Sequence, residues 1–316
     1  MVLVSVLMPM RNASKYVKDA IESVLQEERV DIELVVIDDH SKDSSKDIVM
    51  EIGDPRIRLL DSRERGVAAT LNTGLEVVKG QFITRCDADD RFSEGRLPRQ
   101  VDWLQKHQDY GAICGRFIAM SVSEKYCAEL GMESHSRELT DELQKGYLQT
   151  SFCTYMVHTS LVKELGGFRR FFVTASDIDM QFRLSEMSRI WFSSEVFYHY
   201  RLHNASVTHS QANIQREFFE RTAREFQKQR QACGIDDLQK NCPPKIPRKI
   251  FSMKGSPSKQ MQRFYIGQAW TLFQKGSKPL ALKTMLKACT MCPLNIMAWK
   301  NLFVLLLVKK NIETYH

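Results

Sequence analysis

Residues 80–90 read GQFITRCDADD and carry the most informative pattern in the chain. Phe82–Thr84 is apolar enough for a buried strand, and three carboxylates, Asp87, Asp89 and Asp90, follow within four residues. Like charges a few ångströms apart oppose ionisation. A divalent Mg²⁺ or Mn²⁺ ion removes that cost, because it binds carboxylates together with the phosphates of a substrate. The pattern therefore predicts a metal site, and an acidic turn in which Asp90 caps the next helix is the alternative.

The residues before this segment alternate between two hydrophobic patterns. Apolar, largely β-branched runs predict buried strands, and amphipathic segments between them predict helices. The strands are expected at residues 2–8, 32–37, 57–60 and 82–84, and the helices at residues 14–26, after Ser41 and at residues 67–78. This order predicts an α/β fold with a doubly wound sheet, in which ligands bind at the carboxyl ends of the strands.

Asp38 and Asp39 end the second expected strand and place a second acidic group at the same edge. In a nucleotide site, a carboxylate there can accept the N–H groups of a base or the hydroxyls of a ribose, and a helix cap just downstream is compatible with that role. Residues 9–14 read PMRNAS, so no glycine-rich phosphate loop follows the first strand. This argues against a dinucleotide oxidoreductase and a P-loop kinase, and it leaves the phosphates to a metal.

Two further polar motifs follow in the second half of the chain. Residues 175–183 read ASDIDMQFR, where Asp177 is placed to open a helix. An acid that only complements the helix dipole is the alternative. Residues 198–203 read YHYRLH, and Arg201 and His203 alternate on one face of an expected strand, suited to meeting a pyrophosphate. A structural histidine is the alternative there.

The composition of the 316-residue chain fits a folded protein with a large core, because 43% of its residues are hydrophobic and 26% are charged. The longest apolar run, residues 302–308, is far shorter than the ~20 residues of a membrane span. The N-terminus lacks the basic region of a signal peptide. The eight cysteines form no disulfide framework, and Cys289 and Cys292 lack the second ligand pair of a zinc site. We expect a cytoplasmic protein.

Charge divides the chain into two unlike portions. Residues 238–312 contain fourteen Lys and Arg and no Asp or Glu, so the rest carries −7 within a total of +7. The shift predicts a body at residues 1–210, a connecting helix at 211–237, a basic proline-rich linker at 238–260 and a basic helical region at 261–316, with helices at 262–274 and 279–307. Contact with an anionic membrane surface and packing on the acidic body both explain the basic region. Nucleic acid is not expected as a partner, because no nucleic-acid motif is present.

These motifs, in this order, resemble the inverting family 2 glycosyltransferases of the GT-A fold. The matching strings are VSVLMP at residues 4–9 with Asn12, LVVIDDHS at 34–41, GV at 66–67, LNTGL at 71–75, GQFITRCDADD at 80–90, Arg96, Leu97 and Gln100, GGF at 166–168, Asp177 and YRLH at 200–203, spread over about 205 residues. The resemblance implies a doubly wound, Rossmann-like mixed sheet of GT-A type with a C-terminal helical extension. It also implies that residues 1–210 form the nucleotide-sugar-binding and catalytic domain.

The resemblance also implies a set of site residues. Asp39 would meet the base of a nucleotide-diphosphate-sugar donor, and Asp87 the ribose or the metal. Asp89 would hold Mg²⁺ or Mn²⁺ on the pyrophosphate, helped by His203. The donor-binding residues are expected to be Pro9, Arg11, Asn12, Asp39, Asn72, Asp87 and Arg201.

The mechanism implied by the resemblance is an inverting transfer. Asp177 would deprotonate the acceptor hydroxyl as general base, and the metal would stabilise the departing nucleoside diphosphate as a Lewis acid. Ser176 stands where the family usually has Glu, and residues 150–158 differ from its usual His-Pro-Ser pattern. Both departures concern the acceptor side of the expected site.

The implied activity is a metal-dependent hexosyltransferase with a glycan or lipid-linked acceptor. It would act in cell-surface polysaccharide or lipopolysaccharide synthesis at the cytoplasmic face of a membrane, with the basic region in peripheral contact. Two alternatives stay open. A sugar-nucleotide pyrophosphorylase would need a glycine-rich loop that residues 9–14 do not supply. A catalytically impaired nucleotide-sugar-binding or partner-binding module is motivated by Ser176.

Overall fold

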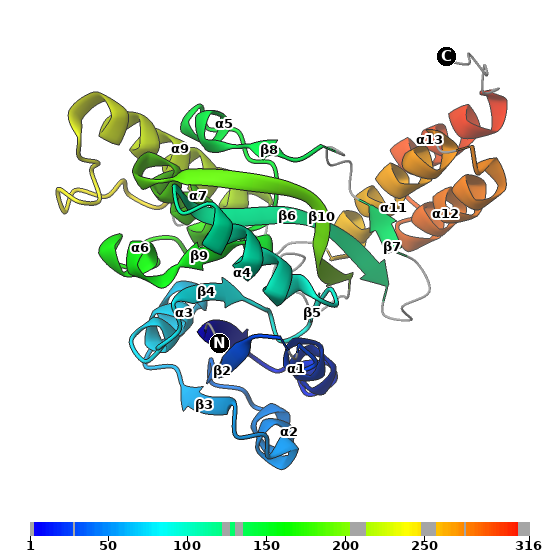
Figure 1. Cartoon of the computed structure of the whole chain (residues 1–316). Helices are drawn as coiled ribbons and strands as arrows, with labels where there is room; N and C mark the ends of the chain where they lie inside the picture. The colour runs from blue at the N-terminus through cyan, green and yellow to red at the C-terminus, as the bar shows by residue number, and fades with distance from the viewer. Residues whose placement is uncertain are drawn as a thin grey trace.

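The computed structural model describes residues 3–27, 29–121, 127–129, 135–202, 213–247, 257–274 and 276–308. Its first part confirms the expected alternation of strands and helices (Figure 1). The elements are β1 (Leu3–Met10), α1 (Val17–Leu25), β2 (Asp31–Asp38), α2 (Ser45–Ile52), β3 (Ile57–Asp61), α3 (Val67–Leu75) and β4 (Phe82–Arg85). β1 lies between β2 and β4, β3 lies beyond β2, and all four strands are parallel. Their carboxyl ends therefore meet at one edge of the sheet.

The rest of the sheet is mixed, as the resemblance implies. Among the described residues the strand order is β3-β2-β1-β4-β9-β6-β10-β5, with β7 beside β6 and β8 beside β10. The further strands are β5 (Arg91–Phe92), β6 (Tyr110–Ser121), β7 (Cys127–Glu129), β8 (Arg137–Glu138), β9 (Met156–His158) and β10 (Arg189–Leu202). β9 runs antiparallel to both β4 and β6, whereas β6 and β10 are parallel. β5 follows β4 in the chain and pairs with β10. The part of β10 around Tyr198 therefore lies close to the loop that follows β4.

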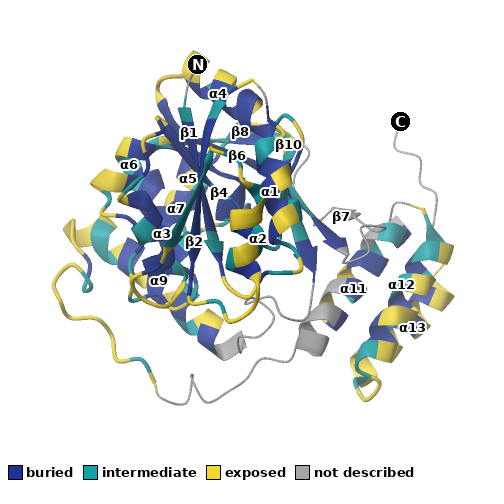
Figure 2. Cartoon of the chain, turned by 90° about the horizontal axis from the view of Figure 1, so that it is seen from below, coloured by how far each residue is buried: buried dark blue, intermediate teal, exposed yellow. Residues whose placement is uncertain are grey.

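Helices cover both faces of the sheet, and each face has its own core (Figure 2). Alternate side chains of a strand point to opposite faces, so Val6 of β1 joins one core and Leu7 the other. The helices of the first core are α1, α2 and α4 (Arg96–Lys106), and those of the second are α3, α5 (Thr140–Gln144), α6 (Thr159–Glu164) and α7 (Ser176–Met187). The strands between them are buried on both sides, which explains their continuous apolar runs.

Pro9 lies near the end of β1, in the middle of the sheet. A proline cannot donate a ladder hydrogen bond, so it is normally excluded from central strands. Here β1 pairs with β4 only over residues 4–7, and the Cys86 N–H donates to the Leu7 carbonyl (3.0 Å) as β4 ends. Pro9 therefore lies beyond the last β4 pair, and β1 can continue past β4 toward the ligand edge.

Two helical parts follow the sheet. α9 (Asn213–Cys233) packs on α7 through an aromatic cluster that includes Phe172, Phe182, Phe219 and Phe226. α11 (Pro257–Gln274), α12 (Lys278–Met291) and α13 (Ile296–Leu307) form a bundle with its own apolar core. The bundle contacts the ends of β6 and β10, where Tyr265 and Ala288 meet Ala119 and Leu202.

The single helical stretch expected at residues 279–307 is wrong, because the structure contains two helices there. α12 ends at Met291, and α13 begins at Ile296 after the turn that contains Pro293. Proline has no N–H and cannot continue a helix, whereas the Asn295 side chain caps α13 by accepting the Met297 N–H (3.1 Å). α11 begins at Pro257, inside the segment expected to be linker. Among the described residues, every helix is too short or too polar to span a bilayer.

Candidate active site

The loops that follow β1 and β2 are joined by a ladder of hydrogen bonds. The Asn12 N–H donates to Ser41 Oγ (2.9 Å), and the Asn12 side-chain oxygen accepts the Lys42 N–H (2.8 Å). Asn12 and His40 both have positive φ, at 48° and 56°, which residues other than glycine adopt rarely. The side-chain oxygen of Asn12 thus fixes the loop, and the role of Asn12 in donor binding stays a prediction.

Asp39 lies at the carboxyl end of β2 and is almost buried. Its carboxylate accepts the Gly66 N–H (3.2 Å) and faces the Arg11 guanidinium (3.5 Å). Its own N–H donates to the Met10 carbonyl (2.7 Å), which ties it to the end of β1. Asp39 and Arg11, two of the expected donor-binding residues, are therefore brought together at the ligand edge, with half of the Arg11 side chain exposed.

Asp87, Asp89 and Asp90 converge in the loop after β4. One carboxylate oxygen from each lies within 4.8 Å of the others. Asp90 is fully buried, and it accepts the Tyr198 O–H (2.8 Å) and the Arg201 N–H (2.7 Å) of β10. Asp87 and Asp89 are half-buried. Asp90 thus anchors the loop to β10, and the other two carboxylates line its outer side.

The electrostatics of this loop favour a cation. Burial raises the pKa of Asp87, although the Arg85 charge opposes this, and burial together with Asp89 and Asp87 raises the pKa of Asp90 well above its usual range. Three carboxylates in such proximity are costly to ionise together. They are also hard oxygen donors of the kind that Mg²⁺ and Mn²⁺ prefer, so the residues present fit a divalent ion.

Arg85, which the sequence interpretation did not single out, forms a two-pronged ion pair with Asp87. Its Nε lies 2.6 Å from Asp87 Oδ1 and its Nη2 lies 3.0 Å from Asp87 Oδ2. Burial alone would lower the pKa of Arg85, but the charges of Asp87 and Asp177 and the hydrogen bonds to Asp87 raise it. Arg85 is thus a cation held against the acidic loop. Its position two residues before Asp87 is the only sequence signal for this pair.

Asp177 lies in the first turn of α7. The preceding Ala175 is left-handed, with φ of 64°, so the chain enters α7 through a strained turn. The negative charge of Asp177 contributes to raising the pKa of Asp87 and of Arg216 on α9, which places all three within electrostatic range. Ser176 beside it is buried.

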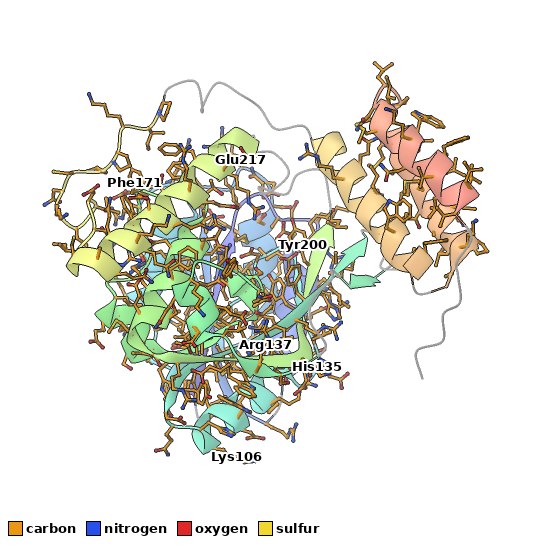
Figure 3. The ribbon with its side chains drawn as sticks, turned by 90° about the horizontal axis from the view of Figure 1, so that it is seen from above. Lys106, His135, Arg137, Phe171, Tyr200 and Glu217 are labelled. Atoms are coloured by element: carbon orange, nitrogen blue, oxygen red, sulfur yellow. The ribbon has the colours of Figure 1, made fainter. Side chains whose placement is uncertain are left out.

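The end of β10 and the start of α9 are linked electrostatically through Tyr200 and Arg216. Tyr200 also contributes to raising the pKa of Arg216, and Figure 3 labels Tyr200 on β10 and Glu217, the next residue of α9. Arg216 forms an ion pair with Glu220 within α9 (2.6 Å). Neither residue of that pair was expected from the sequence.

Arg201 is buried and serves the architecture of the loop. Its Nε donates to the Asp89 carbonyl (2.9 Å), and its guanidinium pairs with Asp19 of α1. These contacts join β10, the acidic loop and α1, so Arg201 is next to the expected metal ligands, and its contact with a pyrophosphate stays a prediction. His203, the third expected metal ligand, lies outside the described residues.

Asn72 is expected to bind the donor, but both hydrogen bonds of its side chain are made to the Phe168 backbone. Its side-chain amide donates to the Phe168 carbonyl (2.8 Å) and its oxygen accepts the Phe168 N–H (2.8 Å), across 96 residues of sequence. Asn72 therefore clamps α3 to the Gly166-Gly167 turn. These contacts give its predicted role in donor binding no support.

A buried arginine supports the loop from behind. Arg96 of α4 donates to Thr84 Oγ1 (2.7 Å) and to Gln100 Oε1 (2.8 Å), and its guanidinium lies over the Phe92 ring at 4.1 Å. Burial lowers the pKa of Arg96 to about 10. It thereby fixes the end of strand β4 to α4, although it carries no predicted chemical role.

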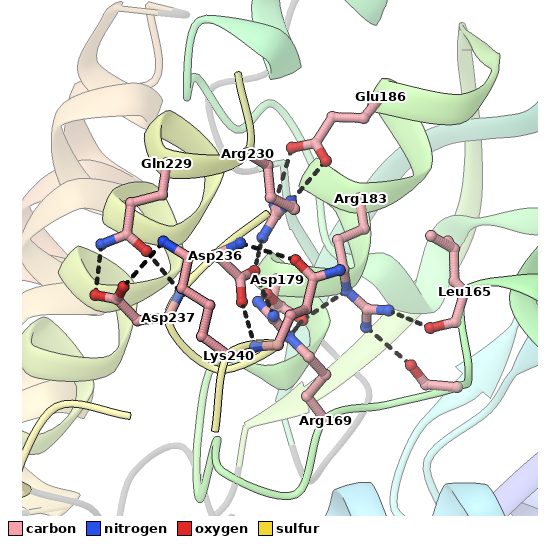
Figure 4. Close-up of polar contacts among 12 residues, drawn as sticks. Leu165, Arg169, Asp179, Arg183, Glu186, Gln229, Arg230, Asp236, Asp237 and Lys240 are labelled. Carbon is pink, nitrogen blue, oxygen red and sulfur yellow. Dashed lines mark hydrogen bonds and ion pairs between the residues drawn. The ribbon is translucent and has the colours of Figure 1, made fainter. Parts of the chain in front are cut away.

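A network of buried charges holds α7 against α9 (Figure 4). Asp179 is fully buried, accepts Arg183 Nε (2.8 Å) and Arg169 Nε (2.9 Å), and belongs to α7 with Asp177. Arg169 also pairs with Asp236 (2.6 Å), which the Arg230 guanidinium of α9 contacts as well. The two aspartates of the DID motif at residues 177–179 therefore have separate surroundings, and the buried one fixes the helix that carries the other.

Comparisons of the sequence with known proteins identify glycosyltransferases. The sequence matches the profile of the family described as glycosyl transferase family 2 over residues 5–164. A glycosyltransferase of Rickettsia prowazekii is 28% identical over 221 residues, which cover 68% of this chain and 69% of its own. The UDP-Glc:α-D-GlcNAc-diphosphoundecaprenol β-1,3-glucosyltransferase WfgD of Escherichia coli is 35% identical over 129 residues, covering 37% of this chain and 51% of WfgD.

Solved structures show the same fold. TarS of Staphylococcus aureus in complex with UDP-GlcNAc superposes with a TM-score of 0.56 at 19% identity. The superposition covers 64% of this chain and 59% of the TarS chain. At that identity the likeness concerns the fold alone.

Proposed function

The chain belongs to glycosyl transferase family 2, a family of transferases (EC 2.4), and on that basis we propose that it moves a sugar from a nucleotide-diphosphate-sugar to a hydroxyl with inversion and with a bound divalent metal. The observation that carries the proposal is the cluster of three carboxylates in the acidic loop, and the electrostatic effect of Asp177 on Asp87 supports it. The carboxylates of Asp87, Asp89 and Asp90 lie within 4.8 Å of one another, and the Asp177 charge acts on Asp87.

The donor would lie along the carboxyl ends of β1, β2 and β4. Asp39 would accept the N–H groups of the base, because its carboxylate is fixed by the Gly66 N–H and is almost buried. Arg11, half exposed beside it, is free to turn toward a phosphate or the base. The names of WfgD and of the TarS complex contain UDP-Glc and UDP-GlcNAc, so uridine-diphosphate sugars are the first donors to test.

Asp89 and Asp87 would hold Mg²⁺ or Mn²⁺, with His203 as a further proposed ligand. When bound, the metal supplies Lewis-acid stabilisation of the departing diphosphate. Burial raises the pKa of Asp87, and the Arg85 charge and its two hydrogen bonds oppose that shift, which favours the ionised form that would bind the metal. Asp90, already bonded to Tyr198 and Arg201, orients the loop.

Asp177 would be the general base that removes the proton of the acceptor hydroxyl. Its location supports this role, because α7 begins at that point and the buried Asp179 holds the helix in place. A base must reach the acceptor on the side opposite the leaving diphosphate for the transfer to invert. Asp177 belongs to α7, whereas the metal-site carboxylates belong to the loop after β4. The base and the metal can therefore act on opposite sides of the sugar.

The acceptor would be a glycan or a lipid-linked sugar in the synthesis of cell-surface polysaccharide or lipopolysaccharide. The support is by likeness: WfgD is named for a diphosphoundecaprenol-linked acceptor, and chondroitin synthase of Escherichia coli is 25% identical over 220 residues. Peripheral contact of residues 238–316 with the cytoplasmic face of a membrane belongs to the same proposal. The basic composition of that region supports it.

One observation favours a second candidate, a nucleotide-sugar-binding module without turnover. Ser176 is buried and neutral beside Asp177, where the resemblance leads one to expect a glutamate. Such a module would bind the donor in the same way but would release no nucleotide.

One experiment tests the proposed function. The wild-type chain is incubated with a panel of uridine-diphosphate sugars and a lipid-linked or glycan acceptor, with and without Mn²⁺, and nucleoside diphosphate release is measured. We expect release that requires both metal and acceptor. Donor-dependent thermal stabilisation without any release would contradict the proposed transferase and favour the binding module.

A further inference from the structure

The outward face of α13 is apolar, although the helix already buries another face. Ala298, Leu302 and Leu305 point into the core of the bundle. With 3.6 residues per turn, the stripe directly opposite contains Ile296, Lys300, Phe303 and Leu307. A helix that is apolar all round is normally buried in a larger core or in a membrane. Among the described residues, nothing covers this stripe.

The exposure of this stripe is large. Ile296 is 69% exposed, Phe303 is 62% and Leu307 is 65%. Met297 and Leu306 flank them at more than half exposure, and Leu294 in the preceding turn is 97% exposed. Exposed leucine or phenylalanine side chains are common singly, but a contiguous group of this kind marks an interaction surface. We name the surface formed by Leu294, Ile296, Met297, Phe303, Leu306 and Leu307 the α13 face.

The net charge of the region that carries the α13 face indicates the kind of partner. Residues 238–312 contain fourteen Lys and Arg and no acidic residue, and Arg263, Lys283, Lys287 and Lys300 are exposed on the bundle. Two copies joined through their α13 faces would bring this basic region against itself, and like charges would oppose that contact. An anionic lipid surface complements both the basic charge and the apolar face, because headgroup phosphates attract the cations and acyl chains accept the apolar side chains.

The dimensions of α13 favour a helix that lies in the interface. It has 12 residues, whereas a spanning helix needs about 20. Lys300 lies within the apolar stripe, and its long apolar stem lets the ammonium reach the headgroups. Trp299 is 45% exposed beside the stripe, with its indole N–H donated to the Pro293 carbonyl (2.8 Å). Tryptophan is typical of the membrane–water interface.

We propose that the α13 face inserts into the interface of an anionic lipid bilayer. The bundle would thereby hold the active site near the membrane, because Tyr265 and Ala288 pack on Leu202, the neighbour of Arg201. Figures 1 and 2 show α11 beside the ends of the sheet and α13 on the outer side of the bundle. Lipid binding itself does not rest on the proposed transferase activity, and only the benefit for a lipid-linked acceptor does.

The test uses the full-length chain and sedimentation with vesicles. One set of vesicles contains phosphatidylcholine alone and the other contains phosphatidylcholine with phosphatidylglycerol. We expect the wild type to sediment with the anionic vesicles and not with the neutral ones. The double variant Phe303→Gln/Leu307→Gln should bind about tenfold or more weakly, because two large apolar side chains no longer enter the lipid.

The controls separate lipid insertion from general effects. Met50→Gln removes an equally exposed apolar side chain, 60% exposed on α2, and should sediment like the wild type. Lys283→Gln/Lys300→Gln should weaken binding to the anionic vesicles. A blue shift of tryptophan emission with anionic vesicles should disappear in Trp299→Phe. All variants should keep the donor-induced thermal stabilisation of the wild type, so loss of vesicle binding is distinguishable from failure of the proposed function.

Three results would overturn the inference. The first is absence of wild-type binding to anionic vesicles, and the second is equal binding by wild type and Phe303→Gln/Leu307→Gln. The third is a wild-type dimer on size-exclusion chromatography that this double variant dissociates, because the α13 face would then join two copies of the chain.

Discussion

Asp177 and the loop at residues 87–90 come from distant parts of the chain, yet the structure gives them one electrostatic environment. Asp87 is held by Arg85, Asp90 by Tyr198, and Asp177 by the strained entry into α7. Each carboxylate therefore has a fixed position, and we expect a different effect when each of them is replaced.

Asp177→Asn should lower the rate of nucleoside diphosphate release by about 10²–10⁴-fold, because a positioned general base contributes that much. Asparagine has nearly the same shape, so the donor should still raise the melting temperature as in the wild type. Both quantities are measured on one preparation with Mn²⁺. Unchanged turnover in this variant would remove Asp177 from the mechanism.

Asp89→Ala should abolish the stabilisation that the donor and Mn²⁺ together give. At a ligand concentration of about 100 times the Kd, the wild type should gain about 2.7 kcal/mol in the free energy of unfolding. Met50→Ala serves as the control for an unrelated surface change. A donor-dependent shift of full size in Asp89→Ala would mean that the metal is held elsewhere.

The acidic loop also predicts a pH dependence of stability in metal-free protein. The folded state raises the pKa of Asp90 through burial and through Asp89 and Asp87, so it binds this proton more tightly than the unfolded chain does. The contribution of Asp90 to stability is therefore present at low pH and is lost as pH rises through the folded pKa, above the ordinary aspartate value of about 4. Relative to the wild type, Asp90→Asn should lose less stability between about pH 5 and pH 7 in urea titrations. A steeper loss in the variant would contradict this assignment.

At the scale of elements, the alternation of strands and helices could be predicted because β1, β2 and β4 are largely apolar and buried, whereas β3 is half-buried. The strand ends at Asp39 and Asp87 could be located for the same reason. The break between α12 and α13 could also be inferred from Pro293, but the apolar spacing on both sides concealed it. Long-range partnerships could not be predicted. Asn72 bonds to Phe168 and Tyr198 bonds to Asp90, and neither pair shares a local pattern.

The network that joins α7 to α9 makes an element-scale prediction. Asp179→Asn would leave the buried Arg183 and Arg169 with weakened counter-charge, and breaking a buried pair typically costs about 3–5 kcal/mol of unfolding free energy. Glu64→Gln removes the exposed partner of Arg170 and should cost about 0–1 kcal/mol. Urea denaturation compares the two variants. Equal, small losses would show that the network does not hold α7.

At the scale of the whole molecule, the sequence divided the chain by charge, but the contact seen between bundle and sheet is apolar. Tyr265 and Ala288 meet Ala119 and Leu202 there. The charge composition could indicate where the basic C-terminal region begins. It could not indicate which apolar residues of α13 are covered, because that depends on the packing of three helices.

The apolar contact predicts how the molecule responds to salt. Small-angle X-ray scattering should give the same radius of gyration at low and high salt, because screening does not weaken apolar packing. Ala288→Glu places a charge in the contact and should enlarge the radius. Expansion of the wild type at high salt would instead favour docking of the basic region by charge.

The site as a whole is tested most directly by locating the metal. Crystals grown with Mn²⁺ and UDP should give an anomalous-scattering peak between the carboxylates of Asp87 and Asp89, about 2.0–2.3 Å from its oxygen ligands, with the diphosphate on its other side. UDP bound with no peak at these two aspartates, or a peak at a site remote from them, would contradict the account.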